Sequence, residues 1–95
     1  MVAACAIHWS KQAVLDMRVI GRRVAVDSPV SARRLLLRII AKVQTLATFP
    51  EIGQAGSRAG TREMVVHTKY LVVYRIFPDG IHIIRVKHSA RKRPA

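Results

Sequence analysis

The chain has little of several features that would assign a protein to a class at once. It has one cysteine, Cys5, which excludes an internal disulfide and fits a reducing compartment. No apolar run approaches the ~18–20 residues that a membrane-spanning helix needs, so we expect no membrane segment. The stretch VAACAI (2–7) is too short for the apolar region of a signal peptide and lacks a basic leader. We therefore expect a cytoplasmic protein.

Acidic residues are also scarce. Five Asp and Glu stand against 17 Lys and Arg, which gives a net charge of +12. Such an excess favours a polyanionic surface or a strongly acidic protein as partner, and charge alone does not separate the two. With only four prolines, 51% hydrophobic residues and no internal repeat, the 95 residues predict one globular domain over 1–95.

The first half of the chain predicts a short buried strand over 2–8 and two helices. Ser10 can cap the first helix, since its hydroxyl can accept from a free backbone N–H. Pro29 follows a break at Asp27-Ser28 and opens a second helix, which should run to about Thr48. Each helix has one apolar face: Ala13, Val14, Met17, Ile20 and Val24 in the first, Ala32, Leu35, Leu36, Ile39, Ile40, Val43, Leu46 and Ala47 in the second.

The second half predicts three strands, at 62–66, 70–77 and 81–87, after an irregular loop over 51–60. Pro78-Asp79-Gly80 predicts the tight turn between the last two, because Asp-Gly tolerates the positive φ of a hairpin turn. Strict alternation in the last strand places Ile81 and Ile83 on one face, and His82, Ile84, Val86 and His88 on the other.

These elements predict an α+β fold of order β-α-α-β-β-β, with the helix hairpin packed on one face of a small, mainly antiparallel sheet. The cations within GTREMVVHTKYLVVYRI (60–76), namely Arg62, Lys69 and Arg75, are then left for the uncovered face or its rim. Arg85 and Arg91 follow on the last strand and the tail. Arginines on adjacent strands repel one another unless an anionic partner relieves them, so together they favour a binding face.

Six blocks in order resemble the RelE/ParE superfamily of toxins from bacterial type II toxin–antitoxin modules. They are W-S-x-x-A, S-P-x-x-A, F-P-E-I-G, G-T-R-E-M-V-V, Y-L-V-V-Y-R-I and I-I-R-V-K-H-S-A-R, from Trp9 to Arg91. The resemblance implies the same order of elements. It also implies a toxin with a cognate antitoxin, whose acidic C-terminal segment would fold on contact. The superfamily holds both RelE-like ribonucleases, which cut messenger RNA on the ribosome, and ParE-like poisons of DNA gyrase, so the fold does not decide the target.

The residues that the resemblance brings forward favour the ParE branch. For a ribonuclease, His88 falls where the YoeB branch has a catalytic histidine, Arg91 where RelE has a cation, and Arg62 opens the second predicted strand, at 62–66. Against this, Leu71 replaces an arginine of many nuclease members, and Ser89 replaces the YoeB tyrosine. We therefore expect a gyrase poison, with a ribosome-dependent ribonuclease and a non-toxic basic interaction module as alternatives. The residues expected to bind antitoxin or target are Arg62, Lys69, Arg75, Arg85, Lys87 and Arg91.

Other side chains predict no further chemistry. His8, His67 and His82 are not spaced as metal ligands and have no Cys or Asp cluster beside them, so we expect no metal site and no cofactor. Cys5 lies in an apolar run and is expected to be an inert thiol. Tyr70 and Tyr74 share a strand face, for which packing is the simplest interpretation.

Overall fold

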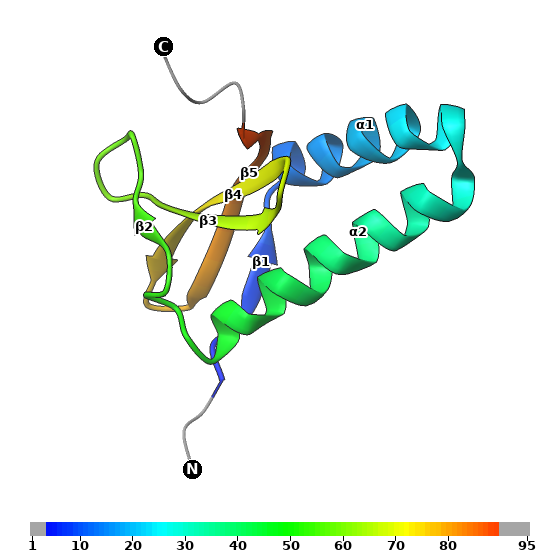
Figure 1. Cartoon of the computed structure of the whole chain (residues 1–95). Helices are drawn as coiled ribbons and strands as arrows, with labels where there is room; N and C mark the ends of the chain where they lie inside the picture. The colour runs from blue at the N-terminus through cyan, green and yellow to red at the C-terminus, as the bar shows by residue number, and fades with distance from the viewer. Residues whose placement is uncertain (1–3, 90–95) are drawn as a thin grey trace.

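Two antiparallel helices lie on one face of a five-stranded sheet (Figure 1). The computed structural model describes residues 4–89. Its elements are β1 (Ile7–Trp9), α1 (Lys11–Asp27), α2 (Pro29–Gln44), the 3₁₀ turn η1 (Thr45–Ala47), β2 (Gln54–Ala55), β3 (Arg62–His67), β4 (Tyr70–Phe77) and β5 (Gly80–His88). The predicted α+β class and helix-on-sheet arrangement are confirmed, and β2 is an addition that the aperiodic loop sequence did not indicate.

The strands run in the order β1-β5-β4-β3-β2, antiparallel except that β1 pairs parallel with β5. The prediction of a buried first strand over 2–8 is wrong in extent. The strand begins only at Ile7, and His8 is exposed because β1 forms an edge with a single neighbour. Residues 2 and 3 of that prediction lie outside the described part of the chain.

Serine side chains set the helix boundaries as the sequence predicts. The Ser10 hydroxyl accepts from the N–H of Ala13 at 3.0 Å, and the Ser28 hydroxyl accepts from that of Ser31 at 3.2 Å. The α-helical geometry of α2 ends at Gln44 rather than Thr48. The last turn tightens into η1, where the hydroxyl of Thr45 donates to the carbonyl of Lys42.

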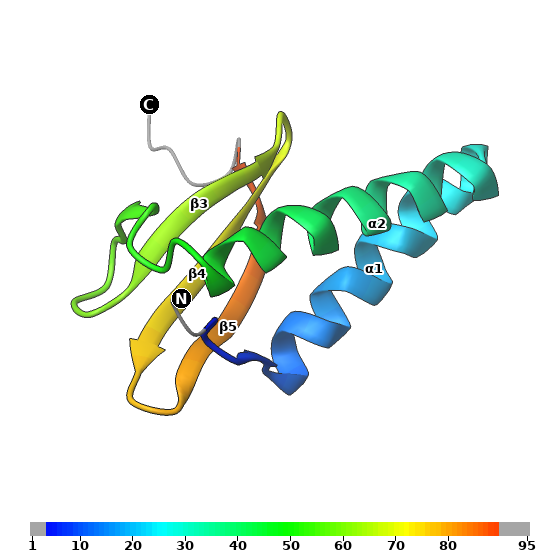
Figure 2. The ribbon, with the colours of Figure 1, turned by 90° about the horizontal axis from the view of Figure 1, so that it is seen from below.

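The hydrophobic core lies between the helix hairpin and the sheet, and the view in Figure 2 shows both helices on the same side of β3, β4 and β5. Its buried members come from both layers: Ala13, Ile20, Ile39, Val43, Leu46, Met64, Val66, Val72, Tyr74, Ile81, Ile83 and Val86. Within residues 4–89, no helix combines the length and apolar character required to cross a membrane.

A β-bulge in β5 changes which of its side chains reach this core. Tyr74 pairs with Ile83 while Val73 pairs with Arg85, so Ile84 is an extra residue in the ladder. As a result Val86 joins Ile83 in the core and is 3% exposed. The prediction that Val86 faces away from Ile81 and Ile83 is therefore wrong, because strict alternation does not survive a bulge.

Candidate functional site

A basic hollow lies on the sheet face that the helices leave uncovered. Its cations are Arg75 from β4, Arg85 and Lys87 from β5, and Arg58 from the loop before β3. Val73, whose neighbours Val72 and Tyr74 point into the core, also lines the hollow and is the register partner of Arg85. Three of the residues predicted to bind a partner thus lie together.

Arg58 is a member of this hollow that sequence reasoning missed. It lies in an aperiodic loop, which is held by a hydrogen bond from Gly56 N–H to the carbonyl of Thr61 at 2.8 Å. Thr61 also donates from its hydroxyl to the carbonyl of Arg58. The buried carboxylate of Glu63 lines the same hollow and accepts from the N–H of Ser57 at 3.5 Å. The hollow is therefore cationic around one buried acidic group.

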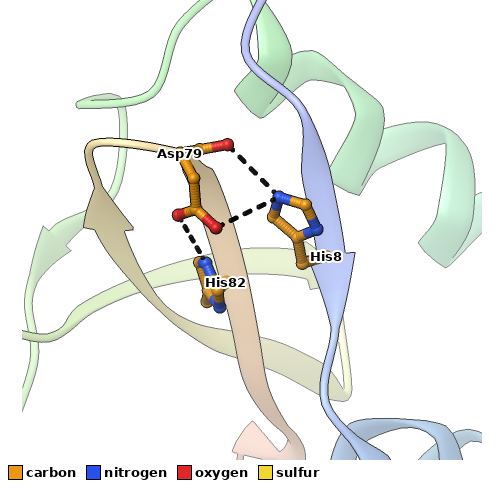
Figure 3. Close-up of side chains that lie close together, drawn as sticks. All are labelled: His8, Asp79 and His82. Atoms are coloured by element: carbon orange, nitrogen blue, oxygen red, sulfur yellow. Dashed lines mark hydrogen bonds and ion pairs between the residues drawn. The ribbon is translucent and has the colours of Figure 1, made fainter.

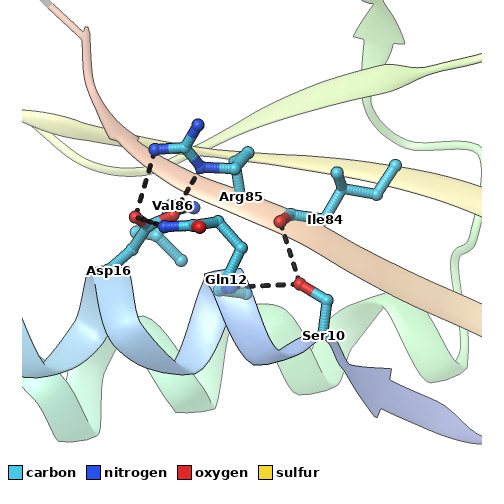
Figure 4. Close-up of polar contacts among 7 residues, drawn as sticks. Ser10, Gln12, Asp16, Ile84, Arg85 and Val86 are labelled. Atoms are coloured by element: carbon cyan, nitrogen blue, oxygen red, sulfur yellow. Dashed lines mark hydrogen bonds and ion pairs between the residues drawn. The ribbon is translucent and has the colours of Figure 1, made fainter.

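Arg85 belongs to the hollow but is also tied to α1 (Figure 4). Its Nε and Nη2 donate to the carboxylate of Asp16 at 2.9 and 3.2 Å, and the Val86 N–H donates to the same group at 2.9 Å. Burial alone would raise the pKa of Asp16. The hydrogen bonds from Arg85, Val86 and Gln12 outweigh that effect and hold the pKa below its ordinary value. Arg85 is thus a structural link as well as a surface cation.

Arg62 does not lie on the uncovered face. It is the register partner of Tyr74, which points into the core, and its Nη1 donates to the carbonyls of Glu51 and Gly53 at 3.1 and 2.9 Å. The guanidinium therefore holds the loop before β2. The sequence predicts Arg62 on the uncovered face or its rim. The placement on the uncovered face is wrong, because the side chain turns to loop carbonyls instead.

Lys69 lies away from the basic hollow, in a second concavity that we call the helix-side groove. The groove combines apolar and cationic side chains of α1, α2 and the β3–β4 turn, namely Val24, Ser31, Arg34, Leu35, Leu37, Arg38, His67, Lys69 and Tyr70. Helix residues Arg34 and Arg38 join Lys69 here, although the sequence gave no reason to pair them with the turn.

The expected ribonuclease residues are not assembled among the described residues. His88 pairs with Tyr70, whose ring it meets edge-on at 5.3 Å between centroids, whereas Arg62 pairs with Tyr74. Tyr70 and Tyr74 are four positions apart on β4, so His88 and Arg62 are separated by about 13 Å along the strand. Leu71 is buried at 4% exposure, and Arg91 lies outside the described part of the chain.

A third grouping consists of His8, Asp79 and His82 (Figure 3). His82 Nε2 lies 2.8 Å from Asp79 Oδ1, and this hydrogen bond holds the pKa of Asp79 below its ordinary value. His8 Nε2 lies 3.2 Å from the backbone carbonyl oxygen of Asp79 and 3.8 Å from its Oδ2. The sequence predicts no metal site, because the spacing of His8, His67 and His82 and the lack of an acidic cluster give no ligand set. The pairing of β1 with β5 instead brings His8 and His82 together beside Asp79.

Comparison with known proteins identifies the family. A family model described as the ParE toxin of the type II toxin–antitoxin system parDE matches residues 7–93. The chain belongs to this ParE toxin family. The resemblance to the RelE/ParE superfamily is thereby confirmed, and the protein is a toxin of a type II toxin–antitoxin system.

Relatives of this ParE-family toxin are themselves named as toxins, one of them with the RelE name. It is 34% identical to Toxin RelE2 of Caulobacter vibrioides over 85 residues, which cover 90% of this chain and 96% of RelE2. It is also 34% identical to the putative toxin Y4kP of Sinorhizobium fredii over 89 residues, or 93% and 92% of the two chains. These names do not decide between gyrase and messenger RNA.

Two solved structures share the fold of this ParE-family toxin. One belongs to the chromosomal ParDE system of P. aeruginosa, with a TM-score of 0.81 and 19% identity over 90% of this chain and 96% of that one. The other is the RelBE2 toxin–antitoxin complex of Mycobacterium tuberculosis, with a TM-score of 0.65 and 21% identity over 95% of each chain. At these identities the likeness establishes the architecture alone.

Proposed function

We propose that this toxin stops growth by poisoning DNA gyrase and that it acts through the basic hollow. The observation that carries the choice of target is the match of residues 7–93 to a family model of ParE toxins. The offset between His88 and Arg62, about 13 Å along the strand, supports the same choice, because a phosphodiester cleaved by its own 2′-OH needs its base and its cationic support at the same phosphorus.

The test compares the two targets with one preparation of purified toxin. We expect inhibition of gyrase supercoiling and accumulation of cleaved DNA, with no messenger cleavage in a reconstituted translation reaction. Arg75→Glu should weaken gyrase inhibition roughly tenfold or more, because it reverses a cation of the hollow. Lys11→Glu, an exposed residue at the start of α1, is the matched control and should leave inhibition unchanged. Normal supercoiling together with messenger cuts would overturn the proposal.

Ribosome-dependent RNA cleavage is the second candidate, and a specific contact favours it. The rings of His88 and Tyr70 meet edge-on. Both residues line a third concavity, distinct from the basic hollow, together with Arg23, Arg85 and Lys87. An imidazole, a phenol and three cations are the groups that such chemistry uses. Abolition of messenger cleavage by His88→Ala in the translation reaction would establish this candidate.

We further propose that a cognate antitoxin neutralises the toxin through the helix-side groove. The groove places Leu35 and Leu37 beside Arg34, Arg38 and Lys69, so it offers apolar contacts and cations to a single ligand. An acidic, amphipathic segment that is disordered alone and folds on binding matches both features. Because the groove and the basic hollow are lined by different cations, inhibition and neutralisation can be separated by mutation.

A further inference from the structure

We propose that His8, Asp79 and His82 form a binding site for a divalent transition-metal ion of the zinc class. Two imidazoles and a carboxylate come from segments that are far apart in the sequence. Their candidate ligand atoms all lie within 4.8 Å of one another. Figure 3 shows the carboxylate of Asp79 between the two rings.

The backbone fixes the three residues relative to one another. His8 and His82 are direct register partners in the parallel pairing of β1 with β5, and Asp79 precedes β5 in the turn. The N–H of Ile81 donates to the carbonyl of Ala6 at 2.8 Å. Gly80 has φ +138°, and a Cβ there would lie 2.4 Å from the Ala6 oxygen, so the start of β5 and the residue before β1 touch backbone to backbone.

The side chains need only small rotations to close around an ion. Tetrahedral zinc with nitrogen and oxygen ligands at about 2.0–2.2 Å places those ligand atoms roughly 3.3 Å apart. Asp79 Oδ1 and His82 Nε2 are at 2.8 Å, and Asp79 Oδ2 and His8 Nε2 are at 3.8 Å, so the pairs bracket this value. The exposed fractions of the three side chains are 37–65%, so an ion can reach them from solvent.

Neighbouring rings support the His82 imidazole in this position. The Phe77 ring meets it edge-on with centroids 4.6 Å apart, and the His8 ring lies 4.8 Å from it. Such contacts limit the orientations of a ligand ring before the ion binds. The site is therefore partly organised without the metal.

The donor set and the charge of the protein restrict the ion. Two imidazoles with one carboxylate suit Zn²⁺, Ni²⁺, Co²⁺ or Cu²⁺, whereas Mg²⁺ and Ca²⁺ prefer oxygen ligands alone. The net charge of +12 opposes any cation, and residues 4–89 supply three ligands to the site. We expect a dissociation constant of about 1–10 µM for Zn²⁺, weaker than at a four-ligand structural site. Water would fill the remaining coordination.

Binding would connect the first strand of the sheet to the β4–β5 turn. The β1 strand has three residues and one neighbouring strand, so it has few backbone contacts of its own. An ion bound only by the folded state stabilises that state, which predicts a melting temperature about 5–10 °C higher at free Zn²⁺ tenfold above the dissociation constant.

The test is calorimetric titration of the untagged full-length protein with Zn²⁺. We expect one ion per chain, with binding weakened about tenfold or more in His8→Ala, His82→Ala and Asp79→Asn. Asp79→Asn preserves the turn, because Asn-Gly suits it as well as Asp-Gly. Two matched controls, His67→Ala and Cys5→Ser, remove other metal-binding side chains and should bind as the parent does.

Two further readouts separate loss of the site from loss of the fold. In EDTA, the melting temperature of Asp79→Asn should equal that of the parent, and only the parent should gain stability on addition of Zn²⁺. With Co²⁺, the parent should develop visible absorption bands that the three variants lack. Absence of binding at 100 µM Zn²⁺, an amount set well above the expected constant, would overturn the proposal. Unchanged binding in all three variants would do so as well.

Discussion

At the scale of single residues, Tyr74 shows how one side chain holds a loop. It is fully buried in β4, and its hydroxyl donates to the carbonyl of Pro50 at 2.8 Å and accepts from the N–H of Gly53 at 2.9 Å. Burial raises the pKa of Tyr74 above its ordinary value. A Cβ at Gly53 would lie 2.6 Å from this hydroxyl, so glycine is needed there. The loop after α2 is thus fixed by the core.

Tyr74→Phe should therefore destabilise the fold by about 1–3 kcal/mol, since it leaves the buried N–H of Gly53 and the part-buried carbonyl of Pro50 without their partner. Urea unfolding followed by circular dichroism measures this change. Tyr70→Phe is the matched control, because Tyr70 is only half-buried, and it should stay within about 0.5 kcal/mol of the parent. Equal losses in the two variants would show that the hydroxyl contacts contribute nothing.

At the scale of secondary-structure elements, α1 completes the edge of β5. The parallel ladder with β1 covers three residues of β5, namely Ile81, His82 and Ile83. Beyond that point, Ser10 donates from its hydroxyl to the carbonyl of Ile84 at 3.0 Å, and Asp16 accepts from the N–H of Val86. Figure 4 shows both side chains reaching toward β5, Asp16 from α1 and Ser10 from the cap before it. These two side chains thus satisfy backbone groups that a longer β1 would otherwise bind.

Asp16→Asn should cost about 1–3 kcal/mol at pH 7, because it removes charge-assisted hydrogen bonds to Arg85 and Val86. The folded-state pKa of Asp16 is lowered relative to an unfolded value near 3.9. The stabilisation is therefore complete above about pH 5 and is lost as the pH falls through the folded-state pKa.

Unfolding free energies at pH 7 and at pH 3 measure this dependence. The difference between parent and Asp16→Asn should shrink at the lower pH. Asp27→Asn, an exposed carboxylate at the end of α1, should stay within about 0.5 kcal/mol of the parent at pH 7. A difference between parent and Asp16→Asn that does not change with pH would contradict the assigned role of the carboxylate.

At the scale of the whole molecule, cations that the sequence places on one face lie on two separate surfaces. The basic hollow lies on the uncovered sheet face, and the helix-side groove lies between the helices and the β3–β4 turn. The sequence predicts a single basic face, on which every cation would serve the same partner. We propose instead that the target binds the basic hollow and the antitoxin binds the helix-side groove.

Arg38→Glu should therefore weaken the complex with the antitoxin roughly ten- to a hundredfold at low salt, because it places a carboxylate against an acidic segment. The loss should shrink as ionic strength rises. Arg33→Glu is the matched control, since Arg33 is an exposed residue of the same helix and does not line the helix-side groove. Titration of both variants at two salt concentrations measures the effect. An equal loss in both would mean that the segment binds elsewhere.

Features set by neighbours in the sequence could be predicted, and those set by distant residues could not. The caps at Ser10 and Ser28 and the Asp79-Gly80 turn follow from local preferences. The bulge at Ile84 depends on how β5 meets β4 and α1, so alternation alone placed Val86 on the wrong face. The sequence predicts Arg62 to be a surface cation. Its partners are backbone carbonyls, and because every residue has one, no residue type in the sequence indicates this contact.

The contacts from α1 to β5 also bear on how copies of this chain meet one another. An exposed strand edge is a template on which a further chain can add by backbone pairing. In β5, the positions past the short parallel ladder are instead occupied by Ser10 and Asp16. A second chain therefore cannot extend the sheet at this edge of β5. Copies of the free toxin in a concentrated solution should not aggregate into fibres through it.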